Sequence, residues 1–317
     1  TQTEPFMHNR TMFCPRGKML GGSSSHNGMV HVRGNAKDFD NWGQLGLTEW
    51  TYDKVLPYFK KSESIEGLDS NFRGDSGPLK LSRSPNGNAL SQVYLDAAQQ
   101  AGYQINNDMN GERQEGFGLM DTTIFNGKRQ STSVTYLHPI KHRSNLEILT
   151  NVTVNKIIFK NKKAIGVECK ANGKDIKYYS SKEVLLSSGA INSPQLLMLS
   201  GIGPENELAK HRIEPVECLE GVGENLQDHL ETYVQYKCKK PVTLHSAQNP
   251  IKMALIGVEW FLFKTGVAAH SNLETGGFVR SNEMSDYPNM QFHFFPSLVL
   301  DHGRKSSTFH AFQAHVG

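Results

Sequence analysis

Two separated glycine-rich segments constrain this chain more than any other feature of its sequence. The first covers residues 17–24 and reads GKMLGGSS, and the second covers residues 189–203 and reads GAINSPQLLMLSGIG. Glycine has no Cβ, so such segments allow the backbone to approach a flat or phosphorylated ligand closely. The pair therefore predicts one bound cofactor that contacts the chain at two places.

The second segment follows a short apolar run, EVLLS at residues 183–187, which is typical of a strand buried on both faces of a parallel sheet. The chain then turns at Gly189. Ser193 is a good N-cap and Pro194 suits the first helical position, so we predict a helix over residues 195–200. The N–H groups at a helix start favour negative charge, which indicates the edge of a cofactor site. From this segment alone, an ordinary βα connection without a ligand is an equal alternative.

The first segment offers small residues and hydrogen-bonding groups together. Gly21 and Gly22 leave room for close approach, and the serines at 23–25 supply hydroxyl and N–H groups. Asn27 and Gly28 add a turn. A cluster of glycine and serine by itself is usually a plain loop, so the surrounding sequence has to separate the two interpretations.

Three stretches of the chain share one recognisable pattern. Residues 15–28 read PRGKMLGGSSSHNG and residues 32–42 read VRGNAKDFDNW; the second glycine-rich segment and residues 221–229, GVGENLQDH, follow in order. These stretches resemble the signatures of the glucose–methanol–choline (GMC) flavoprotein oxidoreductases. Their residues look most similar to those of animal members such as the insect FAD glucose dehydrogenases. His26 and His31 depart from the pattern, since the family usually has an aliphatic and an aromatic residue there. Those departures affect the expected local packing, not the resemblance.

The resemblance implies a mixed α/β fold, with an incomplete Rossmann-like FAD-binding domain interleaved with a substrate domain. Residues 1–50 and 140–232 would form the FAD-binding domain. Residues 51–139 and 233–317 would form the substrate-binding domain or cap.

The resemblance also implies which residues contact FAD. Ser23 and the backbone that follows Asn27 would lie along the cofactor, and Val154 would pack near the adenine. For Val154, a plain core valine is the simpler alternative. The cofactor-binding residues so predicted are Gly21, Gly22, Ser23, Asn27, Gly28, Met29, Val30, Val154, Asn225 and Asp228.

For function, the resemblance implies oxidation of the CH–OH group of an alcohol or sugar, as in a dehydrogenase or an oxidase. A base would take the hydroxyl proton while a hydride passes to N5 of the flavin, and the electrons would go on to oxygen or a quinone-like acceptor. Two alternatives stay open. One is a lyase of the hydroxynitrile type, which cleaves cyanohydrins without net redox change, and the other is a non-catalytic binding or interaction protein.

The two ends of the chain lack further family features. A dinucleotide fingerprint needs GxGxxG within a unit of roughly 30 residues, and only twenty residues precede Gly21. The family's catalytic histidine stands near the C-terminus of longer chains, and His302, His310 and His315 match no part of that motif. We therefore assign no catalytic residue, and we expect the chain to be an incomplete, catalytically inactive fragment of a GMC enzyme.

Composition agrees with an enzyme of about two domains. The chain has 317 residues, of which 37% are hydrophobic and 21% charged, and this is enough for a sizeable core. The formal net charge is only +3. Three lysines at 160–163 form the one compact basic cluster, and because it lies between two strand-like runs it indicates a solvated hairpin. A nucleic-acid partner is not expected.

The sequence gives little indication of a membrane-spanning helix or of a metal site. The longest apolar stretches, such as residues 253–263, are shorter than the roughly 20 residues that a bilayer span needs. The four cysteines show no CxxC spacing, and Pro139 separates His138 from His142, so no metal site is predicted. The compartment stays open, although the resemblance is compatible with a secreted protein.

Periodic patterns predict several elements. Apolar residues at helical spacing favour helices over residues 52–63 and 90–101. An antiparallel meander leading into 183–187 is predicted from β-rich runs at 146–149, 152–159, 164–170 and 176–179. The aromatic run at 291–295 suits the start of a substrate-domain sheet.

Overall fold

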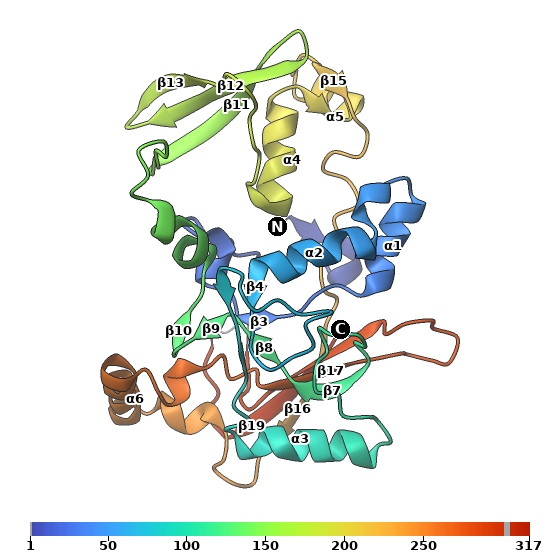
Figure 1. Cartoon of the computed structure of the whole chain (residues 1–317), viewed down its shortest axis with the longest axis vertical. Helices are drawn as coiled ribbons and strands as arrows, with labels where there is room; N and C mark the ends of the chain where they lie inside the picture. The colour runs from blue at the N-terminus through green and yellow to red at the C-terminus, as the bar shows by residue number, and fades with distance from the viewer. Residues whose placement is uncertain (1, 301–304) are drawn as a thin grey trace. The chain divides into compact units, whose positions relative to one another are not determined.

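The structure is a computed structural model that describes residues 2–300 and 305–317 and shows a mixed α/β chain (Figure 1). Close packing divides it into two compact units. Unit 1 joins the residues up to His142 to Leu230–Gly317, and unit 2 is Arg143–His229. The mixed α/β class expected from the sequence is confirmed. By packing, residues 1–50 belong to unit 1, and the division into FAD-binding and substrate domains stays a prediction.

The larger sheet of unit 1 has five antiparallel strands. In spatial order they are β16 (Thr232–Lys237), β19 (Ala311–Val316), β18 (Met290–Phe295), β17 (Thr275–Val279) and β7 (Gly116–Leu119). The register sets Thr275 opposite Phe294 on one side and Leu119 on the other. Strand β18 confirms the strand predicted for the aromatic run at 291–295.

A helix packs against this sheet and forms the main core of unit 1. On α3 (Ala89–Gln100), Leu95 packs in one buried cluster with Phe117 of β7 and Val279 of β17. The helix confirms the prediction over residues 90–101. Because these apolar side chains come from distant parts of the sequence, their burial ties the strands together.

Two further helices of unit 1 follow the first signature. They are α1 (Ala36–Gln44) and α2 (Tyr52–Ser62), and α2 confirms the helix predicted over residues 52–63. Helix α1 begins with a capping box, in which the side chains of Asn35 and Asp38 each accept a backbone N–H of the first turn. The polar residues before the apolar run therefore fix where this helix begins.

Short strands hold the connecting loops of unit 1. Strand β8 pairs with both β3 and β6, β4 pairs with β5 in parallel, and β9 and β10 form a hairpin. The hairpin turn is Asn126–Gly127, and both of these residues have positive φ. The bounds are β3 (Val30–His31), β4 (Glu63–Ser64), β5 (Leu79–Lys80), β6 (Ser82–Arg83), β8 (Asp121–Thr122), β9 (Ile124–Phe125) and β10 (Lys128–Arg129).

The remaining elements of unit 1 include one long apolar helix, α6 (Pro250–Phe263), whose N-terminus is capped by the side chain of Asn249. The shorter elements are β1 (Thr3–Glu4), β2 (Arg10–Thr11), the π-helical turn η4 (Ser133–Leu137), and the 3₁₀ turns η1 (Pro5–Met7), η2 (Gly22–Ser25), η3 (Thr48–Trp50), η5 (His138–Ile140), η6 (Leu244–Gln248) and η7 (Val267–Ala269).

Unit 2 combines an antiparallel meander with a helix. The meander confirms three of the predicted strands, and the lysine cluster at 160–163 lies in the exposed turn between β11 and β12, as expected. Helix α4 packs against β11, and the buried Ser200 Oγ accepts a hydrogen bond from the Ile157 N–H at 2.8 Å. The elements are β11 (Val152–Lys160), β12 (Lys163–Ala171), β13 (Lys174–Tyr179), α4 (Gly189–Leu199), β14 (Ile202–Gly203), α5 (Glu205–Lys210) and β15 (Glu217–Cys218).

Three local predictions in unit 2 are wrong. Residues 146–149 and 183–187 form no strand, and Leu185 is 81% exposed. A parallel strand is stabilised by its neighbours, and no described strand pairs with either segment. Helix α4 begins at Gly189 and not after Ser193, so Ser193 lies inside the helix, where its Oγ accepts the Ser188 N–H at 3.1 Å. Pro194 is the sixth residue of the helix, where it lacks the N–H that would otherwise donate to the Ala190 carbonyl.

Candidate cofactor-binding site

The first glycine-rich segment forms a tight loop in unit 1. Gly21 has φ +88° and precedes the 3₁₀ turn that starts at Gly22, where φ is +53°. The Gly17 N–H donates to Ser23 Oγ at 3.2 Å, and a Cβ on Gly17 would lie 2.3 Å from the carbonyl oxygen of Gly22. The backbone therefore crosses itself so closely that position 17 has no room for a side chain.

One arginine from the β9–β10 hairpin fixes this loop. Arg129 Nη1 donates to the carbonyl oxygens of Ser24 at 3.2 Å and Asn27 at 2.9 Å, and to Asn27 Oδ1 at 2.7 Å. The Thr132 N–H donates to Ser24 Oγ at 3.0 Å, and Thr132 Oγ1 donates to the Gly21 carbonyl at 3.2 Å. Burial lowers the pKa of Arg129. The sequence gives no local signal for either residue, because both lie about 100 positions from the loop.

The end of the loop is held by side-chain and strand contacts. Asn27 Oδ1 accepts the Met29 N–H at 3.2 Å, and Met29 has φ +65°. The Thr123 N–H donates to the Met29 carbonyl at 2.8 Å, and Val30 then pairs with Thr122 of β8. The structure thus brings seven of the predicted residues into one loop: Gly21, Gly22, Ser23, Asn27, Gly28, Met29 and Val30.

A buried cluster of charges lies in unit 1 next to strand β3. Arg73 donates to Glu63 at 2.8 Å, to Asp121 at 2.9 Å and to Asp108 at 2.5 Å. Arg33 Nη2 lies 2.8 Å from Glu63 Oε1, and the side chains of Arg73, Glu63 and Asp121 are each only 1% exposed. These charges are stable in the interior only because each faces an opposite charge.

The environment of Glu63 sets its ionisation. Burial would raise the pKa of Glu63, but hydrogen bonds from His31 and Arg73 and the charges of Arg73 and Arg33 outweigh it and lower the pKa to about 2. His31 Nε2 lies 3.2 Å from Glu63 Oε2. This contact explains the departure at His31, where the family usually has an aromatic residue: the polar ring completes the cluster.

Asn110 connects the charge cluster to the strand that ends the loop. Its Nδ2 donates to the His31 carbonyl at 3.1 Å and to Asp121 Oδ2 at 3.1 Å, and its Oδ1 accepts the Arg33 N–H at 2.8 Å. The charge cluster therefore fixes two backbone groups, the His31 carbonyl and the Arg33 N–H. The members of the cluster come from six separate segments of the chain, and no sequence motif indicated that these segments meet.

Unit 2 brings the second and third signatures together. A cavity of about 440 Å³ is lined by residues of α4 and of the loop that follows β15. Its lining residues are Ala190, Ile191, Pro194, Met198, Gly223, Glu224, Asn225, Leu226 and Gln227. Asn225, with φ +54°, thus borders the cavity; Asp228 is exposed just beyond it, and Val154 is 40% exposed on β11. Their predicted contacts with FAD stay predictions.

Both loops have the features that a phosphorylated, flat cofactor requires. No side chain caps the N-terminus of α4, and a Cβ on Gly189, whose φ is +85°, would meet no atom within 4 Å. The same open space surrounds the Cβ position of Gly22. Uncapped N–H groups and open glycine faces accommodate phosphate groups and ring systems. The residues present therefore fit a dinucleotide such as FAD.

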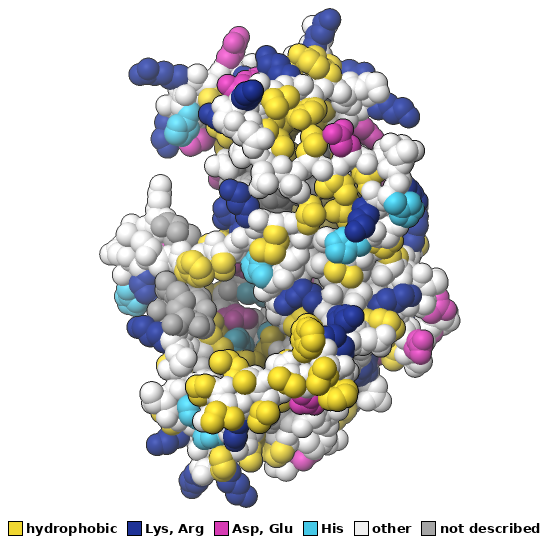
Figure 2. All heavy atoms as spheres, turned by 90° about the vertical axis from the view of Figure 1, so that its left-hand side faces the viewer, with side chains coloured by type: hydrophobic (Ala, Val, Ile, Leu, Met, Phe, Trp, Pro, Cys, Tyr) yellow, Lys and Arg dark blue, Asp and Glu magenta, His cyan; other side chains and the backbone are white. Residues whose placement is uncertain are grey.

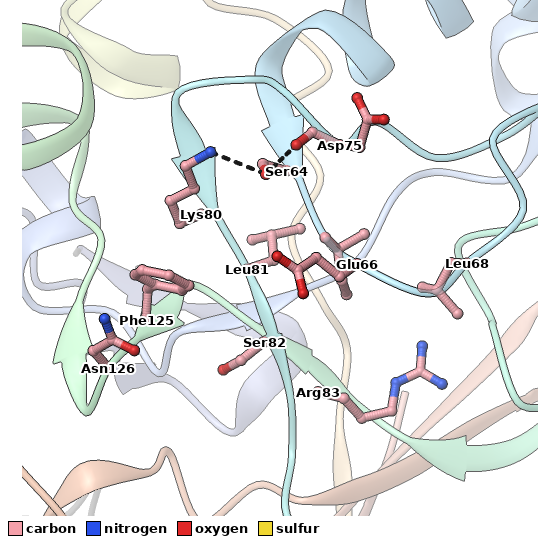
Figure 3. A pocket seen from close by; sticks show the side chains of 11 residues that line it. Ser64, Glu66, Leu68, Asp75, Lys80, Leu81, Ser82, Arg83, Phe125 and Asn126 are labelled. Carbon is pink, nitrogen blue, oxygen red and sulfur yellow. Dashed lines mark hydrogen bonds between the residues drawn. The ribbon is translucent and has the colours of Figure 1, made fainter.

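A cavity of about 620 Å³ in unit 1 lies between the loop after β4, strands β5 and β6, and the β9–β10 turn (Figure 3). Lys80 Nζ donates to Ser64 Oγ at 3.0 Å, and Ser64 Oγ donates to the Asp75 carbonyl at 2.6 Å. Glu66 points into this space, and Phe125 lies on the opposite side in Figure 3. The cavity thus offers a carboxylate and an aromatic face to a ligand, and the cationic side chains of Lys80 and Arg83 line it as well.

The described residues contain no group of three potential metal ligands, and none of their helices has the length and apolar character of a membrane span. His310 Nδ1 lies 2.8 Å from Thr243 Oγ1, and His315 Nδ1 lies 3.2 Å from Glu231. His302 lies outside the described residues. As at the sequence level, we assign none of the three a catalytic role.

Sequence comparisons agree with the signatures. The profile of the GMC oxidoreductase family matches residues 3–231. Mitochondrial choline dehydrogenase of Mus musculus is 50% identical over all of this chain, which covers 53% of that protein. Oxygen-dependent choline dehydrogenase of Staphylococcus saprophyticus is 49% identical, with 57% of its length covered. The chain therefore spans about half the length of the curated relatives it matches. These relatives are choline dehydrogenases, and the finer likeness to insect glucose dehydrogenases stays a prediction.

Two solved structures of other oxidoreductases have the same fold as this chain. An FAD-dependent oxidoreductase from Chaetomium thermophilum matches with a TM-score of 0.80 and 28% identity, over 88% of this chain and 51% of that one. A formate oxidase from Aspergillus oryzae matches with a TM-score of 0.85 and 24% identity, over 95% of this chain and 58% of that one. Both alignments extend across most of the described elements.

Proposed function

Because the chain belongs to the GMC oxidoreductase family, whose members use FAD, we propose that the whole protein oxidises the CH–OH group of a small alcohol. The loop at residues 17–30 carries this proposal. It combines the first signature with open glycine faces, and Arg129 fixes its shape. When bound, FAD would accept the hydride that leaves the substrate carbon.

In this proposal the chain's own residues bind and orient the cofactor. Gly21 and Gly22 let the cofactor approach the backbone, Ser23 offers an exposed hydroxyl, and Asn27–Val30 present their backbone. In unit 2, the uncapped start of α4 and the loop at Asn225 offer N–H groups to phosphate. The electron acceptor is oxygen or a quinone-like compound.

We propose choline or a related cationic alcohol as the substrate class. The support is the identity of about half the residues to two choline dehydrogenases, together with the cavity of Figure 3. Glu66 would neutralise a quaternary ammonium group, and the face of Phe125 would contact it by a cation–π interaction. Arg129 and Phe125 stand on the same hairpin, so one element would serve both the cofactor loop and the substrate cavity.

The cofactor role is tested by reconstitution. The purified chain is incubated with FAD, freed of excess cofactor and examined by flavin absorbance and fluorescence. We expect bound flavin, and Gly22→Val should abolish it because a branched side chain would fill the open space of the loop. A folded chain that retains no FAD would contradict the proposal.

The substrate class is tested separately, on the whole protein loaded with FAD, because the chain by itself is expected to be inactive. Adding choline without oxygen should bleach the flavin absorbance, whereas glucose should not. Glu66→Gln should raise the choline concentration needed for half-maximal bleaching, and Glu112→Gln, which lines a different cavity, serves as the matched control. Equal responses of the two variants would show that Glu66 does not bind the substrate, while leaving the cofactor assignment intact.

A further inference from the structure

Helix α6 presents apolar side chains to solvent along its whole length. None of its 14 residues is buried. Seven large apolar side chains are between 54% and 73% exposed: Ile251, Met253, Leu255, Val258, Phe261, Leu262 and Phe263. Figure 2 faces this side of the molecule and shows hydrophobic side chains gathered at the level of α6. A contiguous apolar surface of this kind marks an interaction site.

Helix α6 contacts the rest of unit 1 at its C-terminal end. Trp260 Nε1 donates to the Gly127 carbonyl at 2.7 Å, and Asn249 caps the other end. Lys264 Nζ lies 4.0 Å from the centre of the Trp260 ring, which is within the range of a cation–π contact. The turn of the β9–β10 hairpin therefore holds the C-terminal end of α6 in place.

The charges around the apolar surface are mainly positive. Lys252 stands in the first turn of α6, Lys264 follows its last turn, and the exposed Lys128 comes directly after Gly127. Glu259 is the one acidic residue of α6, and it accepts a hydrogen bond from Thr265 Oγ1 at 3.2 Å. An occupant of this surface therefore has to combine apolar groups with negative charge.

A second copy of the chain fits this requirement poorly. If two α6 helices packed antiparallel, Lys252 of one would approach Lys264 of the other, and parallel packing would bring identical lysines together. Glu259 is the one acidic residue of α6, and each helix would bring two lysines, Lys252 and Lys264, against it. Like charges brought together in this way oppose association. A flat, negatively charged partner surface suits the lysines and the apolar side chains of α6 better.

We propose that α6 lies in the interface of an anionic lipid bilayer, with its axis parallel to the membrane plane. At 1.5 Å per residue, its 14 residues extend about 21 Å, which is shorter than the roughly 30 Å of a hydrocarbon core. Phe261, Leu262 and Phe263 enter the headgroup region, while Lys128 and Lys252 contact the lipid phosphates. Trp260 stands at the boundary, where tryptophan is favoured.

Vesicle co-sedimentation tests this proposal. The chain is mixed with vesicles of phosphatidylcholine alone, or of phosphatidylcholine and phosphatidylglycerol in equal parts. We expect binding to the mixed vesicles, with weak binding to the neutral ones. Lys128→Gln and Lys252→Gln should each lower the partition coefficient roughly fivefold. Phe261→Ser with Leu262→Ser should lower it by more than roughly tenfold.

The apolar variants carry a matched control. Met284→Ser removes a side chain that is 89% exposed elsewhere in unit 1, and it should leave vesicle binding unchanged. Because the α6 side chains are exposed, the double variant should unfold at the same urea concentration as the unmodified chain. The proposal is overturned if the mixed vesicles do not bind the chain. It is equally overturned if light scattering shows a dimer that the double variant dissociates, since α6 would then bind a second copy.

Discussion

Replacing Arg73 by methionine should strongly destabilise unit 1. The charge cluster balances three guanidinium groups, of Arg33, Arg73 and Arg83, against three carboxylates, of Glu63, Asp108 and Asp121. Methionine keeps much of the volume of Arg73 but leaves one negative charge in excess in the interior. Removing one partner of a buried ion pair costs about 3–5 kcal/mol.

The structure places this effect at the lower end of that range. Without Arg73, Glu63 still faces Arg33 at 2.8 Å, and Asp121 still faces Arg83 at 2.9 Å. We therefore expect the free energy of unfolding to fall by about 3 kcal/mol, which is a large share of the 5–15 kcal/mol typical of a domain.

Urea unfolding followed by tryptophan fluorescence measures this change. The chain has 3 tryptophans, and Trp42, Trp50 and Trp260 all belong to unit 1, so the signal reports that unit alone. The matched control is Arg113→Met, because Arg113 is 57% exposed and lies 3.5 Å from Glu115. An exposed pair of this kind contributes at most about 1 kcal/mol. If both variants lose the same stability, the buried cluster does not stabilise unit 1 and the reasoning is wrong.

Three further predictions concern the cluster, the cofactor loop and helix α6. Since the pKa of Glu63 is lowered from 4.5 to about 2, its contribution is fully present above pH 4.5 and is lost as the pH falls toward 2. Urea titrations at several pH values should show a loss of about 3 kcal/mol over that range that Glu63→Gln lacks; the same acid dependence in both proteins would contradict this assignment. Arg129→Gln removes three hydrogen bonds to the loop and should weaken FAD binding roughly tenfold or more in fluorescence titrations, whereas its neighbour Lys128→Gln should bind FAD normally. Gly17→Ala should destabilise unit 1 by about 1–3 kcal/mol through its clash with backbone, while Gly257→Ala, with open space in helix α6, should stabilise it by up to about 1 kcal/mol. Equal urea midpoints for the two alanine variants would refute the close crossing seen in the loop.

The sequence by itself determined the features that depend on neighbouring residues. The glycine signatures located the loop at 17–30 and the presence of helix α4 but not its start, and periodic apolar residues located α2, α3 and three strands of the meander. Turn chemistry also placed the lysines at 160–163 in an exposed hairpin turn. In each case the pattern acts over a few residues, through backbone conformation or one amphipathic face.

Only the tertiary structure decided which distant groups meet. Arg129 holds the cofactor loop from about 100 residues away, and Arg73 gathers carboxylates from three other segments. The run at 183–187 had the composition of a buried strand, but no strand in the described part of the chain pairs with it. Helix α6 had the composition of a core helix but lies exposed. Burial and hydrogen bonding depend on the partner that folding brings near, and a local pattern does not specify that partner.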